Sequence, residues 1–300
     1  MRGLITCSQS GFYTVTTEAG IYTCHLRGRL KQGPRLGDVA AVGDWVRIEL
    51  VSEGKAMIEE IEPRLRSLSR LDPSPRGNYQ QIILANLDQA VFVFACAQPS
   101  PRLGMLDRFL VIAEKQGIPA LIVANKVDLV GMDQARELFD HYLPLGYPLV
   151  YTSVQENRGI VALQEHLRGK ISVMAGPSGV GKTSLLNAIQ PGLGLAVREV
   201  SQITRKGKHT TVVRQLFPLV DGGYVADTPG LKALALWDVA PEEIDGYFPE
   251  LRALVADCQF NDCTHMHEPG CAVREAVERG EVHPTRYTAY VRMRCGDEDL

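Results

Sequence analysis

One stretch of the sequence decides the fold, and it reads Gly176-Pro177-Ser178-Gly179-Val180-Gly181-Lys182-Thr183. It follows an apolar run at 170–175 and precedes a helical pattern at 184–189, which is the strand–loop–helix context of a phosphate-binding P-loop. Glycines let backbone N–H groups surround phosphate oxygens, and the helix N-terminus adds its dipole. We therefore expect this stretch and Ser184 to bind a nucleotide, with Lys182 at the β- and γ-phosphates and Thr183 on Mg²⁺.

Strand and helix patterns alternate on both sides of this loop. Helical stretches, for example 133–142 and 159–167, lie between apolar strands that we predict at 91–96, 120–124, 149–151, 171–174 and 223–226. Continuous apolar strands separated by helices are typical of a parallel sheet covered on both faces. The central part of the chain is therefore predicted to be an α/β domain.

A second motif indicates which nucleotide is bound. The strand at 120–124 runs into Asn125-Lys126-Val127-Asp128, the NKxD pattern. An aspartate carboxylate can accept hydrogen bonds from N1–H and the 2-amino group of guanine, and adenine offers neither donor there. Thr152-Ser153-Val154, after the next strand, would support the base, with Ser153 in contact. These residues favour GTP over the alternative of a P-loop ATPase or nucleotide kinase.

A third motif, Asp227-Thr228-Pro229-Gly230, follows the strand at 223–226. This DxxG pattern would place Asp227 near Mg²⁺ and the N–H of Gly230 near the γ-phosphate. Between it and the P-loop lies the basic segment Arg205-Lys206-Gly207-Lys208-His209-Thr210-Thr211. We expect a switch loop there, with Thr210 or Thr211 closing on Mg²⁺; a solvated basic loop is the alternative.

The order of these motifs is unusual. GTPases ordinarily run P-loop, switch, DxxG, NKxD and then the base-supporting loop, whereas here the last two come first. A circular permutation would keep the sheet and its site while moving the termini, which compact domains often tolerate. The DxxG switch then leads directly into the C-terminal region, so the nucleotide state could move that region.

The residue after the DxxG motif is Leu231, where many GTPases carry a glutamine that orients water. Since leucine cannot orient water, hydrolysis should be slow unless another group serves, and His209 in the switch loop is our candidate. The alternative is that His209 faces phosphate or RNA at the surface. The catalytic set that we predict is His209, Lys182 and Thr210.

The N-terminal part of the chain has a different pattern. Alternating β segments at 12–16, 21–26, 44–50 and 56–58 are separated by glycine-containing turns. About five such strands predict a small closed barrel, of OB or SH3-like type. A proline-rich stretch at 71–77 then indicates a linker.

Near the C-terminus, Cys258, Cys263, His265 and Cys271 lie within fourteen residues of one another. Three thiolates and one imidazole are a standard tetrahedral zinc set, and four protein ligands leave no open position for catalysis. We therefore predict one structural Zn²⁺, with His267 as the competing imidazole ligand. The other cysteines, at positions 7, 24, 96 and 295, are interpreted as ordinary thiols.

Composition and charge exclude several classes of protein. The 300 residues are 45% hydrophobic and carry a formal charge of −3, which is unlike a disordered chain or a uniformly basic nucleic-acid binder. Residues 169–230 carry seven basic and three acidic side chains, whereas residues 231–300 carry seven and fourteen. The longest apolar runs, such as 90–97, are shorter than the roughly 20 residues of a membrane span. With no export signal, we expect a cytoplasmic protein that binds no membrane.

The motifs together resemble the RsgA/YjeQ family of circularly permuted GTPases, and the likeness covers nearly the whole chain. The shared segments are 85–89, 125–128, 176–183, 207–211, 227–230 and the Cys258…Cys263-x-His265…Cys271 run with its Glu268-Pro269-Gly270-Cys271-Ala272-Val273 ending. The resemblance implies an N-terminal OB-fold (residues 1–72), a permuted GTPase domain (73–233) and a helical zinc domain (234–300). It also implies that the histidine before the paired threonines, His209, is the catalytic group.

For function, the resemblance implies a GTP hydrolase that acts late in maturation of the small ribosomal subunit. The subunit and its rRNA would be the partners, and the subunit would stimulate hydrolysis of GTP to GDP before the protein is released. Away from the ribosome, the protein would be a monomer. The barrel carries two basic groups, which could contact RNA or could be a solvated face: Arg27, Arg29, Lys31 and Arg35, then Arg64, Arg66, Arg70 and Arg76. Since the barrel begins almost at Met1, we expect no basic N-terminal extension. The alternative function is a nucleotide-gated RNA-binding switch with negligible turnover.

Overall fold

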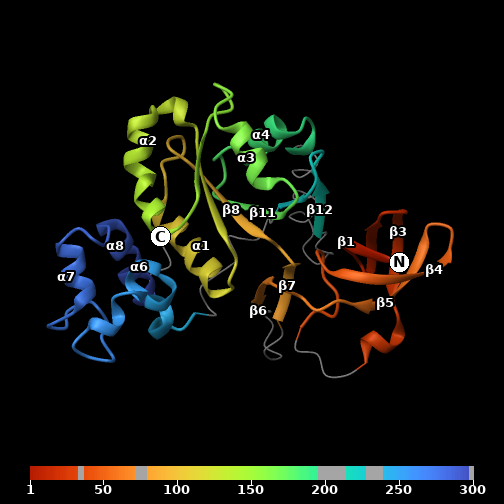
Figure 1. The fold of residues 1–300 in the computed structure, drawn as a ribbon, viewed down its shortest axis with the longest axis horizontal. Coiled ribbons are helices and arrows are strands. Elements are labelled where there is room, and N and C mark those ends of the chain that lie inside the picture. Colours follow the sequence, from red (N-terminus) through yellow and green to blue (C-terminus); the bar gives the residue numbers. More distant parts are fainter. Residues whose placement is uncertain (33–36, 72–79, 195–213, 228–238, 297–300) are drawn as a thin grey trace. The chain divides into compact units, whose positions relative to one another are not determined.

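The computed structural model describes residues 1–32, 37–71, 80–194, 214–227 and 239–296. The chain divides into two compact units, and Figure 1 labels helices and strands of both. Unit 1 holds Met1–Ala90, Ile160–Ala175 and Lys182–Ala233, and unit 2 holds Val91–Gly159, Gly176–Gly181 and Leu234–Leu300.

Unit 1 begins with a closed barrel of five strands. Its order is β1–β2–β3–β5–β4, and β4 pairs with β1 to close the ring. All neighbours are antiparallel except β3 and β5, which run parallel. The five strands are β1 (Arg2–Gln9), β2 (Phe12–Thr17), β3 (Gly20–Leu26), β4 (Trp45–Ser52) and β5 (Lys55–Ile61). This five-stranded closure confirms the OB-like alternative of the sequence prediction.

Alternating side chains fill this barrel. In β5, Ala56 and Ile58 are buried, whereas the other residues of the strand are exposed or half-buried. Side chains from all five strands meet in the interior, including Leu4, Val15, Cys24, Val46 and Ile58, each at most 2% exposed. Period-two burial of this kind is what the sequence pattern predicts for a strand with one face in a core.

Two further strands follow the barrel and were not expected from the sequence. β6 (Ser67–Leu71) and β7 (Gln80–Ala85) pair antiparallel, so the predicted linker begins inside a strand, and residues 72–79 lie outside the described part. Gly43 is close to the end of β7, because a Cβ added at its φ of +92° would lie 2.0 Å from the carbonyl oxygen of Ala85. Only glycine permits that approach of barrel and hairpin.

The rest of unit 1 contributes one half of the α/β architecture. β11 (Ile171–Ala175) and β13 (Tyr224–Asp227) pair parallel, and helices α3 (Ile160–Leu167) and α4 (Lys182–Ile189) accompany them. β12 (Arg214–Pro218) runs antiparallel both to β13 and to β1 of the barrel. The predicted parallel pairing is found between β11 and β13, and β12 is an antiparallel addition that the sequence did not predict. β12 escaped prediction because it is short, begins with polar residues and ends on proline.

Unit 2 contains the other strands of the α/β architecture, in the order β10–β9–β8. The strands are β8 (Gln89–Ala95), β9 (Ala120–Asn125) and β10 (Leu149–Thr152). Every residue of β8 is buried, which explains its continuous apolar sequence. The helical elements are α1 (Leu103–Lys115), α2 (Met132–Phe139) and the 3₁₀ helices η2 (Val127–Leu129) and η3 (Asp140–Leu145). The helix predicted at 133–142 therefore ends earlier, and its last residues belong to η3.

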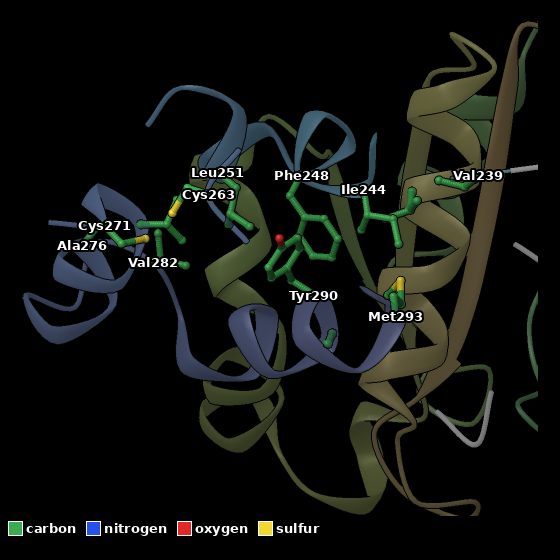
Figure 2. Packing of buried hydrophobic residues seen from close by; sticks show 13 residues of the cluster. Val239, Ile244, Phe248, Leu251, Cys263, Cys271, Ala276, Val282, Tyr290 and Met293 are labelled. Atoms are coloured by element: carbon green, nitrogen blue, oxygen red, sulfur yellow. The ribbon is translucent and has the colours of Figure 1, made fainter. Parts of the chain in front are cut away.

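Short helices make up the C-terminal part of unit 2: η6 (Pro241–Tyr247), α6 (Pro249–Arg252), η7 (Val255–Asp257), α7 (Ala272–Glu278) and α8 (Pro284–Arg294). Their buried side chains form one cluster that includes Val111 of α1 (Figure 2). In Figure 2, Phe248 and Tyr290 lie at its centre, while Cys263 and Cys271 lie at one end. None of the described helices has the length and apolar character that a membrane span requires.

Candidate nucleotide-binding site and metal cluster

The P-loop has a backbone that only glycine adopts easily at several positions. Gly176, Gly179 and Gly181 have φ angles of 150°, 83° and 99°. A Cβ at Gly176 would lie 2.0 Å from the carbonyl oxygen of Val93, and one at Gly181 would lie 2.4 Å from Asn125 Nδ2. The glycines of the motif therefore have two local purposes, the turn itself and close packing against the ends of β8 and β9.

Asn125, the first residue of the NKxD motif, joins that motif to the P-loop. Its side chain is buried, and Nδ2 donates a 2.8 Å hydrogen bond to the carbonyl oxygen of Val180. Thr152, at the end of β10, donates from Oγ1 to Asn125 Oδ1 over 2.9 Å. Both ends of the amide are thereby satisfied, which fixes its orientation and holds the loop against the strands.

Lys126 adds a second link. It has the left-handed φ of 62°, and its ammonium donates to the carbonyl oxygens of Gly179, at 2.8 Å, and of Gln98. Gln98 belongs to the segment between β8 and α1. The lysine thus connects three segments of unit 2, and its charge assists both hydrogen bonds.

Asp128, the residue predicted to select guanine, is oriented by Ser153. Ser153 Oγ donates to Asp128 Oδ1 over 2.5 Å and accepts from the backbone N–H of Glu156 over 3.1 Å. Ser153 and Arg158 also exchange two backbone hydrogen bonds that close the turn between them. One carboxylate oxygen of Asp128 is thus held by a buried hydroxyl.

Cys96 directly follows β8 and is close enough to Asp128 to feel the charge of this carboxylate. Burial, with a smaller contribution from the charge of Asp128, raises the pKa of its thiol to about 11. Since only a thiolate is an effective nucleophile, Cys96 stays a neutral thiol at physiological pH. This agrees with its interpretation as an ordinary core cysteine.

The predicted phosphate and magnesium residues fall partly within the described chain. Pro177 and Ser178 lie in the loop, while Lys182, Thr183 and Ser184 form the first turn of α4. Asp227 is the last residue of β13. His209, Thr210, Thr211, Gly230 and Leu231 lie outside the described residues.

The four predicted zinc ligands come together in unit 2. The ligand atoms of Cys258, Cys263, His265 and Cys271 all lie within 4.8 Å of one another. His265 Nδ1 is 3.5 Å from the sulfur of Cys258 and 3.4 Å from that of Cys271, and these two sulfurs are 4.0 Å apart. Zn–S bonds of about 2.3 Å and Zn–N bonds of about 2.0 Å at tetrahedral angles require separations of this size. The residues present therefore fit a tetrahedral metal ion.

The two imidazoles of this region differ in their surroundings. His265 is fully buried, and its second ring nitrogen, Nε2, lies 3.3 Å from Asp245 Oδ2. A carboxylate behind a metal-binding histidine fixes the ring and raises its basicity. His267 is exposed and is not among the clustered ligands.

Glu268 and α8 hold the loop that carries these ligands. The Glu268 carboxylate accepts backbone N–H bonds from Thr264, Met266 and His267 at 2.9, 3.1 and 3.2 Å, and a further bond from the Thr264 hydroxyl. Desolvation alone would raise the pKa of Glu268, but these hydrogen bonds outweigh it and hold the pKa well below its usual value. From α8, Tyr287 donates to the carbonyl oxygen of His265 over 2.7 Å.

Several of the basic barrel residues have structural partners. Arg64 donates to both oxygens of buried Asp44 at 2.7 Å. Arg27 and Arg29 both form ion pairs with Glu59, at 2.8 and 3.4 Å. These three arginines therefore stabilise the barrel locally, which weakens the sequence argument that they form an RNA-binding face.

Sequence reasoning missed the residues that orient the motifs. Thr152 was noted only as part of the base-supporting loop, although it fixes the Asn125 amide. Gln98 contributes a backbone carbonyl, which any residue could supply, so no side-chain signal existed. Glu268 was quoted as part of the family-like run, but its contact with three backbone N–H groups depends on the loop conformation.

Comparisons with known proteins agree with this geometry. A family model described as RsgA GTPase matches residues 61–237, and one described as RsgA N-terminal domain matches residues 2–58. The small ribosomal subunit biogenesis GTPase RsgA of Gemmatimonas aurantiaca is 45% identical over 295 residues, which cover 97% of this chain and 96% of that protein.

Two solved structures are similar along the whole chain. The crystal structure of YjeQ from Thermotoga maritima matches with a TM-score of 0.79 and 37% identity, covering 100% of this chain and 99% of that one. The structure of YloQ, a circularly permuted GTPase, matches with a TM-score of 0.73 and 32% identity, covering 99% and 95%. This chain belongs to the RsgA family of circularly permuted GTPases.

Proposed function

We propose that this protein hydrolyses GTP to GDP and phosphate during late maturation of the small ribosomal subunit, is stimulated by that subunit and leaves it after hydrolysis. The GTPase part of the proposal is supported by the carboxylate of Asp128, which Ser153 orients by a hydrogen bond. The side chains of Asn125 and Lys126, from the same motif, bind the backbone of the P-loop. The ribosomal part is supported by the relative from Gemmatimonas aurantiaca, which is named a small ribosomal subunit biogenesis GTPase.

Guanine recognition follows from hydrogen-bond chemistry. Asp128 Oδ1 already accepts from Ser153, and an ionised carboxylate has further lone pairs for N1–H and the 2-amino group of guanine. We assign Asn125 and Lys126 to positioning, because their side chains hold the P-loop to the base motif. Adenine would leave the carboxylate without these donors, so GTP should be preferred over ATP.

At the phosphates, we assign backbone N–H groups of 176–181 and the N-terminus of α4 to binding of the oxygens. Lys182 would neutralise charge on the β- and γ-phosphates, and Thr183, Thr210 and Asp227 would hold Mg²⁺. The ion would supply electrostatic stabilisation of the transferred phosphoryl group. We assign His209 to the attacking water and the N–H of Gly230 to the γ-phosphate.

The metal cluster is assigned one structural Zn²⁺. Cys258, Cys263, His265 and Cys271 saturate a tetrahedral ion, so no position is left for a substrate. The ion would order a loop that has few apolar residues of its own. The domain limits that we propose are 1–72 for the barrel, 73–233 for the GTPase domain and 234–300 for the zinc-binding domain.

We further propose that the protein is cytoplasmic, monomeric away from the ribosome, and in contact with rRNA when bound. The test is multiple-turnover GTP hydrolysis with and without purified small ribosomal subunits, with large subunits as the control. Stimulation by small subunits alone, lost in Lys182→Ala, is the expected result. Binding of GTP and of subunits without stimulation would instead favour the nucleotide-gated RNA-binding switch.

A further inference from the structure

Helix α8 contacts the metal-binding loop through two tyrosines. Tyr287 donates to the carbonyl oxygen of His265 over 2.7 Å, and Tyr290 donates to that of Thr264 over 2.9 Å. Tyr290 is fully buried and its ring packs edge-on against Phe248 (Figure 2). The position of the loop and that of α8 are therefore linked by hydrogen bonds to the backbone on either side of a metal ligand.

Arg286 joins the same helix to α1 of the GTPase domain and, through Asp107, to η3 of that domain. This side chain is fully buried, and Nη1 donates to Asp107 Oδ1 of α1 over 2.8 Å. Nε and Nη2 donate to the two carboxylate oxygens of Glu250 at 2.6 and 3.1 Å. Tyr142 of η3 donates to the same Asp107 oxygen over 2.7 Å, so α8, α6, α1 and η3 meet at one guanidinium.

The charges make this junction hard to rearrange. One buried cation faces two carboxylates, and Asp107 Oδ2 is buried with no hydrogen-bond partner. Moving α8 away from α1 would strand Asp107 in an apolar setting, which is strongly unfavourable. The planar guanidinium serves both carboxylates at once, a geometry that the single ammonium of lysine does not reproduce.

Both GTPase elements at this junction lead to the predicted guanine site. α1 follows the segment of Gln98, whose carbonyl accepts from Lys126 of the NKxD motif. η3 is joined to β10 by the hydroxyl of Tyr151, which donates to Asp140 Oδ1 over 2.6 Å. β10 ends at Thr152, which orients Asn125. The junction thus borders both segments that position the guanine-binding side chains.

We propose that Arg286 is a positioning residue through which metal occupancy of the Cys₃His cluster raises the affinity for guanine nucleotide. The inference rests on the proposed function in that the nucleotide is a guanine nucleotide. Metal binding orders the ligand loop, the loop fixes α8 through Tyr287 and Tyr290, and Arg286 holds α1 and η3 in the arrangement that supports Lys126 and Asn125. Coupling of this kind is reciprocal, so bound nucleotide must also retain the metal.

The experiment uses the full-length zinc-loaded protein and GDP, with two readouts. The first is the rate of zinc release to a chromophoric chelator with and without saturating GDP. The second is the affinity for fluorescent GDP before and after the metal is removed, with hydrogen exchange locating any loss of structure. In the unmodified protein, we expect GDP to slow zinc release, and zinc to tighten GDP binding, by about fivefold or more.

Arg286→Lys keeps the positive charge but loses the planar guanidinium that binds both carboxylates. The fold-changes in zinc release and in GDP affinity should therefore both fall towards one in this variant. Arg279→Lys is the matched control and should keep both effects, since Arg279 follows α7 directly and forms exposed ion pairs with Glu275 and Glu281. Tyr287→Phe removes one hydrogen bond from the route and should reduce both effects even if Arg286→Lys does not fold.

Two results would overturn the proposal. One is GDP binding in the unmodified protein with no change in zinc release. The other is full coupling in folded Arg286→Lys or, where that variant does not fold, in Tyr287→Phe. A protein that binds no guanine nucleotide at all would instead refute the nucleotide site, so the two failures can be told apart.

Discussion

Arg286 of α8 donates a 2.8 Å hydrogen bond to Asp107 of α1, and neither side chain is exposed to solvent. The two residues are far apart in sequence and lie in different predicted domains. Their contact is part of the core shared by the C-terminal helices and α1. Burial raises the pKa of Asp107, although the charge of Arg286 opposes that rise. A buried pair of this kind contributes little over an apolar pair, but either partner alone is costly.

We expect Arg286→Met to lower the free energy of unfolding by about 3–5 kcal/mol, because Asp107 and Glu250 are left buried without their cation. Adding Asp107→Asn should recover part of this loss, since it removes one uncompensated charge. Denaturant unfolding of the two single variants and the double variant measures the coupling. Strictly additive losses would show that the two side chains do not interact. Arg279→Met is the control and should leave the free energy of unfolding unchanged.

Asp128→Asn should weaken GTP binding by at least about tenfold, since a charged hydrogen-bond acceptor is replaced by an amide. The variant should gain affinity for xanthosine nucleotides, whose carbonyl at position 2 can accept from the new amide group. Ser153→Ala should weaken GTP binding to a smaller degree, because the carboxylate loses the hydroxyl that orients it. Competition binding assays measure these three changes in nucleotide affinity. Unchanged selectivity in Asp128→Asn would exclude this residue from base recognition. Asp133→Asn, on the exposed side of α2, is the control.

Gly181→Ala should abolish nucleotide binding while the protein stays folded. The new Cβ would lie 2.4 Å from Asn125 Nδ2 and displace the amide that holds the P-loop. Gly146→Ala has a similar positive φ of 89° with no atom near the added Cβ, so it measures the cost of the backbone conformation alone. Isothermal titration with GDP compares the two variants. Equal affinities would show that the contact with Asn125 does not position the loop.

Glu268→Gln should lower the affinity of the cluster for zinc by about 10–100-fold, the usual effect of removing a group that supports metal ligands. A neutral amide is a weaker acceptor for the backbone N–H bonds that the carboxylate receives from Thr264, Met266 and His267. Competition with a chelator of known affinity measures the change. Glu278→Gln, on the exposed side of α7, is the control. Unchanged zinc affinity in Glu268→Gln would mean that the loop is held without this carboxylate.

Stability should fall as the pH drops from about 6.5 towards 4, partly because of His141. Burial, then the charges of His283 and Arg286, lower the pKa of His141 from its usual 6.5 to about 4. Its ring stacks on that of His283 with centroids 4.1 Å apart, and neither of its nitrogens has a hydrogen-bond partner. The unfolded chain therefore takes up a proton first, so the stability present above pH 6.5 is lost as the pH falls.

His141→Phe keeps an aromatic ring in the stack but cannot titrate. Its unfolding free energy should depend less steeply on pH between 6.5 and 4 than that of the unmodified protein. Urea unfolding at several pH values gives both curves. Parallel curves would show that His141 does not contribute to the acid sensitivity.

The sequence by itself determined the motifs and their order, because these depend on residue type and local spacing. The glycines of 176–181, the NKxD run and the four clustered metal ligands each carry their chemistry in a short segment. The barrel strands were recognisable for the same reason, since apolar and polar residues alternate within the sequence of each strand. From these the permuted GTPase, the barrel and the metal cluster were predictable.

Only the tertiary structure decided which side chains orient those motifs. Thr152, at the end of β10, and Ser153, just after it, contact Asn125 and Asp128, and Gln98 contributes only a backbone oxygen. In the sequence, Arg286 is one more charged residue of a polar C-terminal segment. The antiparallel β12 likewise depends on its neighbours β1 and β13 more than on its own short sequence. Contacts between distant segments have no local signature, because their free energy comes from partners that only the folded chain brings within reach.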